Sequence, residues 1–289
     1  MEPDFLQQLK MHLWGTLSQR ETDAVLFWII EETTGLSRTD VITKRLSNID
    51  CQQAEQLRNF VGRVAKGEPV QYVLGYTDFC GLRIGVEPGV LIPRPETEDL
   101  VHLCTEQLPS DSHGKHPCII DLCTGSGCIA LAMKHLIPNA IVEGWDISGK
   151  ALETAQKNAA DLDLDVTFRK VDVLNPASPS MMGSRREATL LVSNPPYVCE
   201  SERAEMERNV LEHEPSLALF VPDDDPLRFY RAIAQTGQRL LQPGGKVVVE
   251  INQRFGHEVI TLFESSGYIF AAVLKDRYGK DRFVLAHKK

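Results

Sequence analysis

The sequence lacks the features that mark secreted and membrane proteins. No apolar run in its 289 residues approaches the roughly 20 needed to span a bilayer. Its first ten residues, MEPDFLQQLK, have neither the basic and apolar regions of a secretory signal nor the arginine-rich character of a transit peptide. We therefore expect a soluble, cytoplasmic protein.

The sequence also lacks any C-x-x-C pair, and its seven cysteines are an odd number. Cys118, Cys123 and Cys128 are evenly spaced, but they fall on an expected strand, loop and helix. A metal shared by the three is not expected, and reduced thiols are the usual state of such cysteines in the cytosol.

Clusters of lysine and arginine are absent, and the formal net charge is −9. An acidic surface repels a phosphate backbone, although a local basic patch can survive on it. We expect no direct binding of nucleic acid. The length suits one large domain and a smaller one.

Residues 1–69 show only helical patterns, and Asp50 with Gln53 forms the signature of a capping box. We interpret them as an N-terminal helical bundle that recognises substrate, or, almost equally well, one that only stabilises the chain. Residues 70–92 alternate short apolar runs with glycine, which is typical of a β-hairpin linker.

Residues 93–289 alternate strands and helices, which predicts an α/β fold with a doubly wound, mostly parallel sheet. The segment DRYGKD is too short for a helical crossover, so the last two strands should pair antiparallel. The seven expected strands lie near 118–122, 141–145, 166–171, 189–193, 246–251, 269–275 and 282–287. The expected helices lie near 96–108, 128–137, 149–161, 226–241 and 254–266.

A glycine-rich turn between a strand and a helix, IIDLCTGSGCIALAM, predicts a cofactor site. Gly125 and Gly127 let the backbone turn tightly and approach a ligand. Asp146 ends the next strand, nineteen residues beyond Gly127, where a carboxylate can bind a ribose diol. The same spacing also fits a dinucleotide site, so a dehydrogenase is an alternative.

Two further carboxylates favour S-adenosylmethionine over a dinucleotide. Asp121 directly precedes the loop, where it can orient the loop or meet a cationic ligand but would repel a pyrophosphate. Asp172 ends the third strand and can serve an adenine amino group, or equally well cap a turn. No residues downstream suggest a hydride-transfer site.

The stretch LLVSNPPYVCE ends an apolar strand in Asn194-Pro195-Pro196-Tyr197. Prolines fix the backbone and force the preceding residue to be extended. Ligands of open α/β sheets bind at the carboxyl ends of the strands, so Asn194 and the carbonyls beside it are expected in the site. A lone Asn-Pro would instead be interpreted as a rigid turn.

The order D-L-x-T-G-S-G, Asp at the next strand end and N-P-P-Y resembles a class I, Rossmann-like S-adenosylmethionine-dependent methyltransferase. LIPRPETE at 91–98 and EPSLAL at 214–219 resemble the HemK/PrmC family. These enzymes are peptide chain release factor N5-glutamine methyltransferases, which modify the glutamine of a Gly-Gly-Gln motif. The resemblance covers essentially the whole chain and implies release factors as partners. We expect a monomer.

The resemblance implies catalytic roles for Asn194, Pro195 and Tyr197. An amide nitrogen is a poor nucleophile, because its lone pair is delocalised into the carbonyl. Acceptors at the Asn194 side-chain oxygen and the Pro195 carbonyl would fix that nitrogen and stabilise its growing positive charge. The Tyr197 ring can lie against the amide plane. No classical base is required, since the proton can leave after methyl transfer.

The implied binding residues fall into two sets. The expected cofactor set is Cys123, Thr124, Gly125, Ser126, Gly127, Asp146, Asp172, Val173 and Asn194. The expected substrate set is Arg94, Glu96, Asn194, Pro195, Pro196 and Tyr197. The alternative without a role in substrate binding is that Arg94 and Glu96 belong to a solvated helix start. The family usually has glycine at position 123, and a glycine-rich stretch where this chain has VPDDDPL.

Four other functions remain open at this point. A related enzyme could modify a glutamine of a ribosomal protein, but PRPETE argues against that. Adenine-N6 or cytosine-N4 methyltransferases share the Asn-Pro-Pro-aromatic pattern, but they need a basic groove for a flipped base. A non-enzymatic cofactor-binding regulator would have no use for Asn-Pro-Pro-Tyr, and nicotinamide binding would reveal a dehydrogenase.

Overall fold

The computed structural model describes residues 5–43, 49–108, 116–175 and 187–289. The chain divides into two compact units, Met1–Tyr76 with Glu207–His213, and Thr77–Met206 with Glu214–Lys289. Among the helices in the described ranges, none has both the length and the apolar character needed to cross a bilayer.

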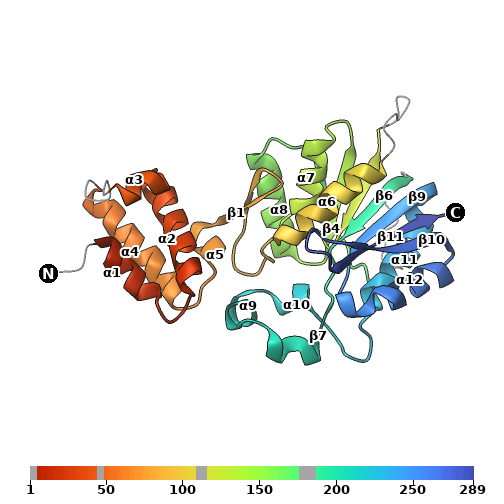
Figure 1. Ribbon diagram of the computed structural model, residues 1–289. Coiled ribbons are helices and arrows are strands. Elements are labelled where there is room, and N and C mark those ends of the chain that lie inside the picture. Colours follow the sequence, from red (N-terminus) through yellow and green to blue (C-terminus); the bar gives the residue numbers. More distant parts are fainter. Residues whose placement is uncertain (1–4, 44–48, 109–115, 176–186) are drawn as a thin grey trace. The chain divides into compact units, whose positions relative to one another are not determined.

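The first unit consists of helices, as expected for the N-terminal region (Figure 1). They bury an aliphatic core that includes Leu13, Ile29 and Leu57. Asp50 accepts from the backbone N–H of Gln53 and Gln53 accepts from that of Asp50, which confirms the capping box. The helices are α1 Phe5–Leu13, α2 Gln19–Thr34, α3 Arg38–Ile42, α4 Cys51–Ala65, α5 Val70–Leu74 and α9 Arg208–His213.

The hairpin is shorter than the expected 70–92. Val70–Leu74 forms helix α5, which Gly75 ends at φ 84°, and the hairpin is limited to β1 Tyr76–Phe79 and β2 Leu82–Gly85. Val70 and Val73 are three residues apart and both buried, so this apolar run has helical spacing that alternation with glycine concealed.

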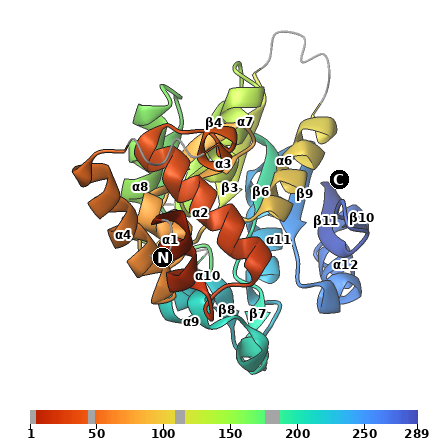
Figure 2. The ribbon, with the colours of Figure 1, turned by 60° about the vertical axis from the view of Figure 1, so that its left-hand side comes forward.

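The second unit contains a seven-stranded sheet in the order β10-β11-β9-β6-β3-β4-β5. Figure 2 shows β4, β3, β6, β9, β11 and β10 side by side in that order. Strand β3 pairs parallel with β4 and β6, whereas β11 lies between β10 and β9 and pairs antiparallel with both. This confirms the mostly parallel sheet with an antiparallel last strand. The strands are β3 Cys118–Leu122, β4 Ile141–Asp146, β5 Thr167–Lys170, β6 Ala188–Ser193, β9 Leu241–Glu250, β10 Tyr268–Lys275 and β11 Asp281–Lys288.

Helices cover both faces of this sheet (Figure 1). Neighbouring residues of a strand point to opposite faces. Ile119 accordingly packs in one core cluster with residues of α6 and α7, and Ile120 in another with residues of α11 and α12. The helices of this unit are α6 Pro95–Gln107, α7 Cys128–Leu136, α8 Gly149–Asp161, α10 Ser216–Leu219, α11 Arg228–Leu240 and α12 Gly256–Ser265.

Short elements follow the strand ends. β7 Val198–Cys199 pairs parallel with β8 Phe220–Val221, and the 3₁₀ helices η3 Glu200–Glu205 and η4 Gln253–Phe255 follow β7 and β9. Strand β9 begins five residues earlier than its expected start at 246, because Leu241 already pairs with Ala188 of β6. Since β4, β3, β6 and β9 run parallel, their carboxyl ends share one edge of the sheet.

Candidate active site

A cavity lies at the carboxyl ends of the central strands, within the second unit. Its walls include the ends of β3, β4, β5 and β6, the segment Gly89–Leu91 and helix α10. Six of the nine expected cofactor residues line it: Cys123, Gly125, Asp146, Asp172, Val173 and Asn194. The structure therefore brings together residues from four separate strand ends, those of β3, β4, β5 and β6.

The other expected residues lie outside the cavity lining. Thr124, Ser126 and Gly127 belong to the loop and the start of α7, and of the substrate set only Asn194 and Pro196 line the cavity. Pro195 is buried, and Tyr197 is half-buried.

The loop after β3 turns sharply. Gly125 has φ 56°, and Gly127, which caps α7, has φ 82°, so both adopt a backbone region that favours glycine. A Cβ on Gly127 would also lie 3.0 Å from the Cβ of Ala155. Cys123 adopts φ 61°, which gives a physical reason for the glycine that the resembled family has there.

Asp146 ties this loop to the end of β4. Its Oδ2 accepts the backbone N–H of Gly125 at 2.9 Å, and its Oδ1 accepts that of Ser148 at 2.8 Å. Burial raises the pKa of Asp146, and the backbone donors act against that shift. Because this carboxylate also lines the cavity, it can hold the loop and accept hydrogen bonds from a ligand.

Asp121 holds the loop by hydrogen bonds to Thr124 and to the first turn of α7. Its Oδ2 accepts the Thr124 hydroxyl at 2.5 Å and the Ala130 backbone N–H at 3.2 Å, while its Oδ1 has no hydrogen-bond partner among the described residues. The side chain is fully buried, and burial raises its pKa to about 7. Asp121 does not line the cavity, so of its two expected roles the structure favours orienting the loop.

Asp172 forms the turn cap that was one of its two expected interpretations. Its Oδ1 accepts the backbone N–H of Leu174 at 3.0 Å, which is a turn cap, and the residue also lines the cavity. Val173 beside it is buried and contributes an apolar wall.

Asn194 follows β6 and is half-buried at the cavity. Its Nδ2 donates to the hydroxyl of Thr97 at 3.1 Å, and that hydroxyl donates to Glu250 at 2.9 Å. The hydroxyl of Tyr197 donates to the other oxygen of Glu250, also at 2.9 Å. The Asn-Pro-Pro-Tyr segment is thus connected twice to one buried carboxylate, directly by Tyr197 and through the Thr97 hydroxyl by Asn194.

Arg94 and Glu96 precede Thr97 at the start of α6. The Nη2 of Arg94 lies 2.6 Å from Oε1 of buried Glu214, whose Oε2 accepts the Ile92 backbone N–H at 3.2 Å. Glu96 is half-buried. Neither Arg94 nor Glu96 lines the cavity.

Sequence reasoning missed four residues that shape this site: Thr97, Asn158, Glu214 and Glu250. Thr97 lies within PRPETE and Glu214 begins EPSLAL, so the motifs themselves were the available signal. Asn158 donates to the carbonyls of Ser126 at 2.9 Å and Gly85 at 3.0 Å. No sequence pattern around Asn158 predicts these contacts, because Gly85 and Ser126 are 73 and 32 residues away in the sequence.

Comparison with known proteins places the chain in a family. A family model described as "Methyltransferase small domain" matches residues 100–215, and one described as "PrmC N-terminal domain" matches residues 13–75. The release factor glutamine methyltransferase of Bacteroides thetaiotaomicron is 45% identical over 97% of this chain and 98% of its own. That of Flavobacterium psychrophilum is 38% identical over 97% of each.

Solved structures show the same fold at low identity. The hMettl16 catalytic domain in complex with the MAT2A 3'UTR hairpin 6 has a TM-score of 0.56 at 15% identity, over 80% of this chain and 82% of that one. A methyltransferase from Pyrococcus furiosus has a TM-score of 0.51 at 17% identity, over 72% and 89%. Both support a class I methyltransferase fold. Because curated relatives match nearly the whole chain, and not its catalytic sheet alone, the chain belongs to the release factor glutamine methyltransferase family.

Proposed function

We propose that this chain transfers the methyl group of S-adenosylmethionine to the side-chain amide nitrogen, N5, of the glutamine in the Gly-Gly-Gln motif of class I peptide chain release factors. The observation that supports this most strongly is the meeting of Asn194, Asp146 and Asp172 at one cavity, in a chain of this family.

Both the carboxylates and the apolar walls of the cavity suit S-adenosylmethionine. Asp146 and Asp172 bring carboxylates to an otherwise largely apolar lining that includes Val171 and Phe229. Carboxylates accept hydrogen bonds from a ribose diol or an adenine amino group and attract a cationic ligand, whereas a pyrophosphate would be repelled. When bound, S-adenosylmethionine supplies an electrophilic methyl group on a sulfonium.

The protein's part in the reaction is to position an amide and to stabilise charge on it. The side-chain oxygen of Asn194 and the backbone carbonyl of Pro195 each accept one N–H of the glutamine amide. These acceptors hold the nitrogen in place and stabilise the positive charge that develops on it. Pro195 and Pro196 keep both acceptors rigid, since each proline fixes its own φ. In this mechanism Tyr197 lies against the amide plane.

The remaining expectations belong to the same proposal. Loop residues Thr124, Ser126 and Gly127 complete the cofactor site, and Arg94 and Glu96 contact the substrate. The N-terminal helices, residues 1–69, recognise the release factor, residues 70–92 link them to the catalytic domain at 93–289, and the enzyme acts as a cytoplasmic monomer without binding nucleic acid directly.

The test is to incubate the protein with labelled S-adenosylmethionine and a class I release factor, and to locate the methyl group by mass spectrometry. We expect one methyl on the glutamine of Gly-Gly-Gln, and none on a release factor in which that glutamine is replaced by glutamate. Parallel reactions contain a large-subunit ribosomal protein or duplex DNA. Faster labelling of either one would contradict the proposal and identify the substrate class instead.

A further inference from the structure

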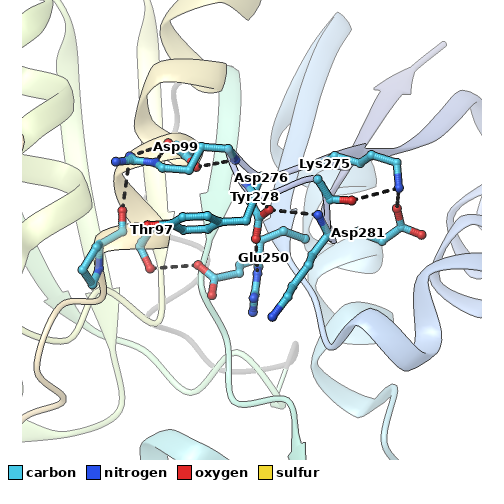
Figure 3. A network of polar contacts seen from close by, with 12 residues as sticks. Thr97, Asp99, Glu250, Lys275, Asp276, Tyr278 and Asp281 are labelled. Carbon is cyan, nitrogen blue, oxygen red and sulfur yellow. Dashed lines mark hydrogen bonds and ion pairs between the residues drawn. The ribbon is translucent and has the colours of Figure 1, made fainter.

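A buried carboxylate lies behind the Asn-Pro-Pro-Tyr segment. Glu250, the last residue of β9, is 1% exposed, and its two oxygens accept separate hydroxyls, Thr97 at 2.9 Å and Tyr197 at 2.9 Å (Figure 3 shows the Thr97 contact). Burial raises the pKa of Glu250, whereas both hydroxyls and the nearby charge of Arg282 favour its ionised form. Each hydroxyl donates its proton to one of the two carboxylate oxygens.

This arrangement determines which way the Asn194 amide points. A threonine hydroxyl has one proton, and Thr97 gives it to Glu250, so toward Asn194 its oxygen can only accept. The group of Asn194 that faces Thr97 must therefore be the NH₂, at 3.1 Å. The reversed amide would place two acceptor oxygens against each other. The side-chain oxygen of Asn194 is left facing away from Thr97.

We infer that Thr97 and Glu250 are positioning residues for methyl transfer: Glu250 orders the Thr97 hydroxyl, and that hydroxyl holds the Asn194 oxygen in the direction where it accepts the substrate N–H. The inference rests on the proposed function. It assigns a task to the threonine of PRPETE and to a glutamate on a distant strand, neither of which lines the cavity.

The start of α6 is also held by a contact that does not involve the Thr97 hydroxyl. Asp99 lies two residues after Thr97 on α6 (Figure 3). Its carboxylate accepts hydrogen bonds from the Nε–H of Arg277 at 2.8 Å and from the backbone N–H of Arg277 at 3.1 Å. Arg277 belongs to the turn between β10 and β11. Because this contact also holds the start of α6, we expect the similarly shaped valine at position 97 to remove the hydrogen bonds and leave the helix in place.

The test compares Thr97→Val with Thr97→Ser, which restores the hydroxyl, and with Thr105→Val, which makes the same change farther along α6. Among the described residues, Thr105 donates to the His102 carbonyl, at 2.7 Å. We expect Thr97→Val to lower kcat about 10- to 100-fold, with the calorimetric Kd for S-adenosylmethionine and the KM for the release factor changed less than about twofold. Thr97→Ser should recover most of the lost kcat.

A second readout needs no turnover. The side-chain ¹⁵N amide signal of Asn194, assigned by its loss in Asn194→Ala, should shift in Thr97→Val and keep its position in Thr97→Ser and Thr105→Val. The inference would be overturned if the Asn194 amide signal had the same chemical shift in Thr97→Val as in the wild-type protein. It would also be overturned if Thr97→Val had the wild-type kcat. Wild-type protein that leaves the release factor unmethylated would instead overturn the proposed function, and the amide signal would still test the orientation of Asn194.

Glu250→Gln tests the carboxylate itself. A glutamine side chain has one acceptor oxygen and one NH₂ group. In either orientation of this amide, the hydroxyl of Thr97 or that of Tyr197 loses its acceptor. If Glu250 and Thr97 act through the same amide, Thr97→Val combined with Glu250→Gln should reduce kcat no further than the more severe single variant. Losses in kcat that multiply in the double variant would show that the two residues act independently, against the inference.

Discussion

Arg94 and Glu214 form an ion pair, with 2.6 Å between Nη2 and Oε1, that joins the segments LIPRPETE and EPSLAL. The carboxylate side is 1% exposed and the guanidinium side 34%. Burying the Glu214 carboxylate without its ion-pair partner would cost stability. If Arg94 were only part of a solvated helix start, any polar residue would be tolerated at its position.

Arg94→Met should lower the free energy of unfolding by about 3 kcal/mol, because among the described residues Glu214 then keeps the Ile92 N–H as its one donor. Urea denaturation measures this change. Lys275→Met is the matched control, since it breaks an exposed pair with Asp281 and should lower stability by less than about 1 kcal/mol. Equal losses in the two variants would show that burial of Glu214 does not matter to the pair.

Asp146→Asn should weaken binding of S-adenosylmethionine about 10- to 100-fold. The amide cannot accept both the Gly125 and Ser148 N–H groups, and it removes a charge from the cavity wall. Calorimetry on the variant, with Asp165→Asn as an exposed control, measures the effect. An unchanged affinity in folded Asp146→Asn would remove Asp146 from the cofactor site.

The raised pKa of Asp121 predicts a pH-dependent stability. Its folded-state pKa of about 7 exceeds its ordinary 3.8, so between these values the folded chain holds a proton that the unfolded chain releases. Stability from this group therefore falls as pH rises across that window, by about 1.4 kcal/mol per pH unit.

Asp121→Asn removes this titration. Its free energy of unfolding, relative to the unsubstituted protein, should rise between pH 5 and about pH 7 and then level off. Urea denaturation of both proteins at each pH gives the difference, in which the other titrating groups cancel. A difference that is constant with pH would mean that Asp121 is ionised throughout the window.

Cys123→Gly should be more stable than Cys123→Ala by about 1 kcal/mol, because only glycine relieves the backbone at φ 61°. Both changes remove the thiol, so the comparison isolates the backbone. The same pair of changes at Cys104, inside α6, should give the opposite order, since glycine weakens a helix. An alanine at position 123 that matches or exceeds glycine in stability would exclude strain there.

Local patterns in the sequence predicted much of this architecture. The capping box at Asp50 depends on residues three apart, and the antiparallel pairing of β10 and β11 follows from the six residues of DRYGKD. Asp146 and Asn194 could be assigned to one cavity because both lie at the carboxyl ends of parallel strands, which meet at one edge.

The contacts around Asn194 could not be predicted in the same way. Thr97 is 97 residues from Asn194 and 153 from Glu250, and only the packing of α6 against the sheet brings the three together. Tyr197 was expected to act through its ring, whereas the structure shows its hydroxyl donating to Glu250. The left-handed backbone of Cys123 lies in a loop that Asp146 holds at Gly125, across 21 residues of sequence.

The rate of a single turnover by Asn194→Ala, at saturating S-adenosylmethionine and release factor, tests the central claim most directly. Asn194 follows a strand end and is only half-buried, so the fold should persist without its amide. We predict a fall of at least about 100-fold in the methyl-transfer rate, because the substrate nitrogen loses an acceptor that positions it and stabilises its developing charge. A folded Asn194→Ala enzyme that transfers the methyl group at a near-normal rate would contradict the account.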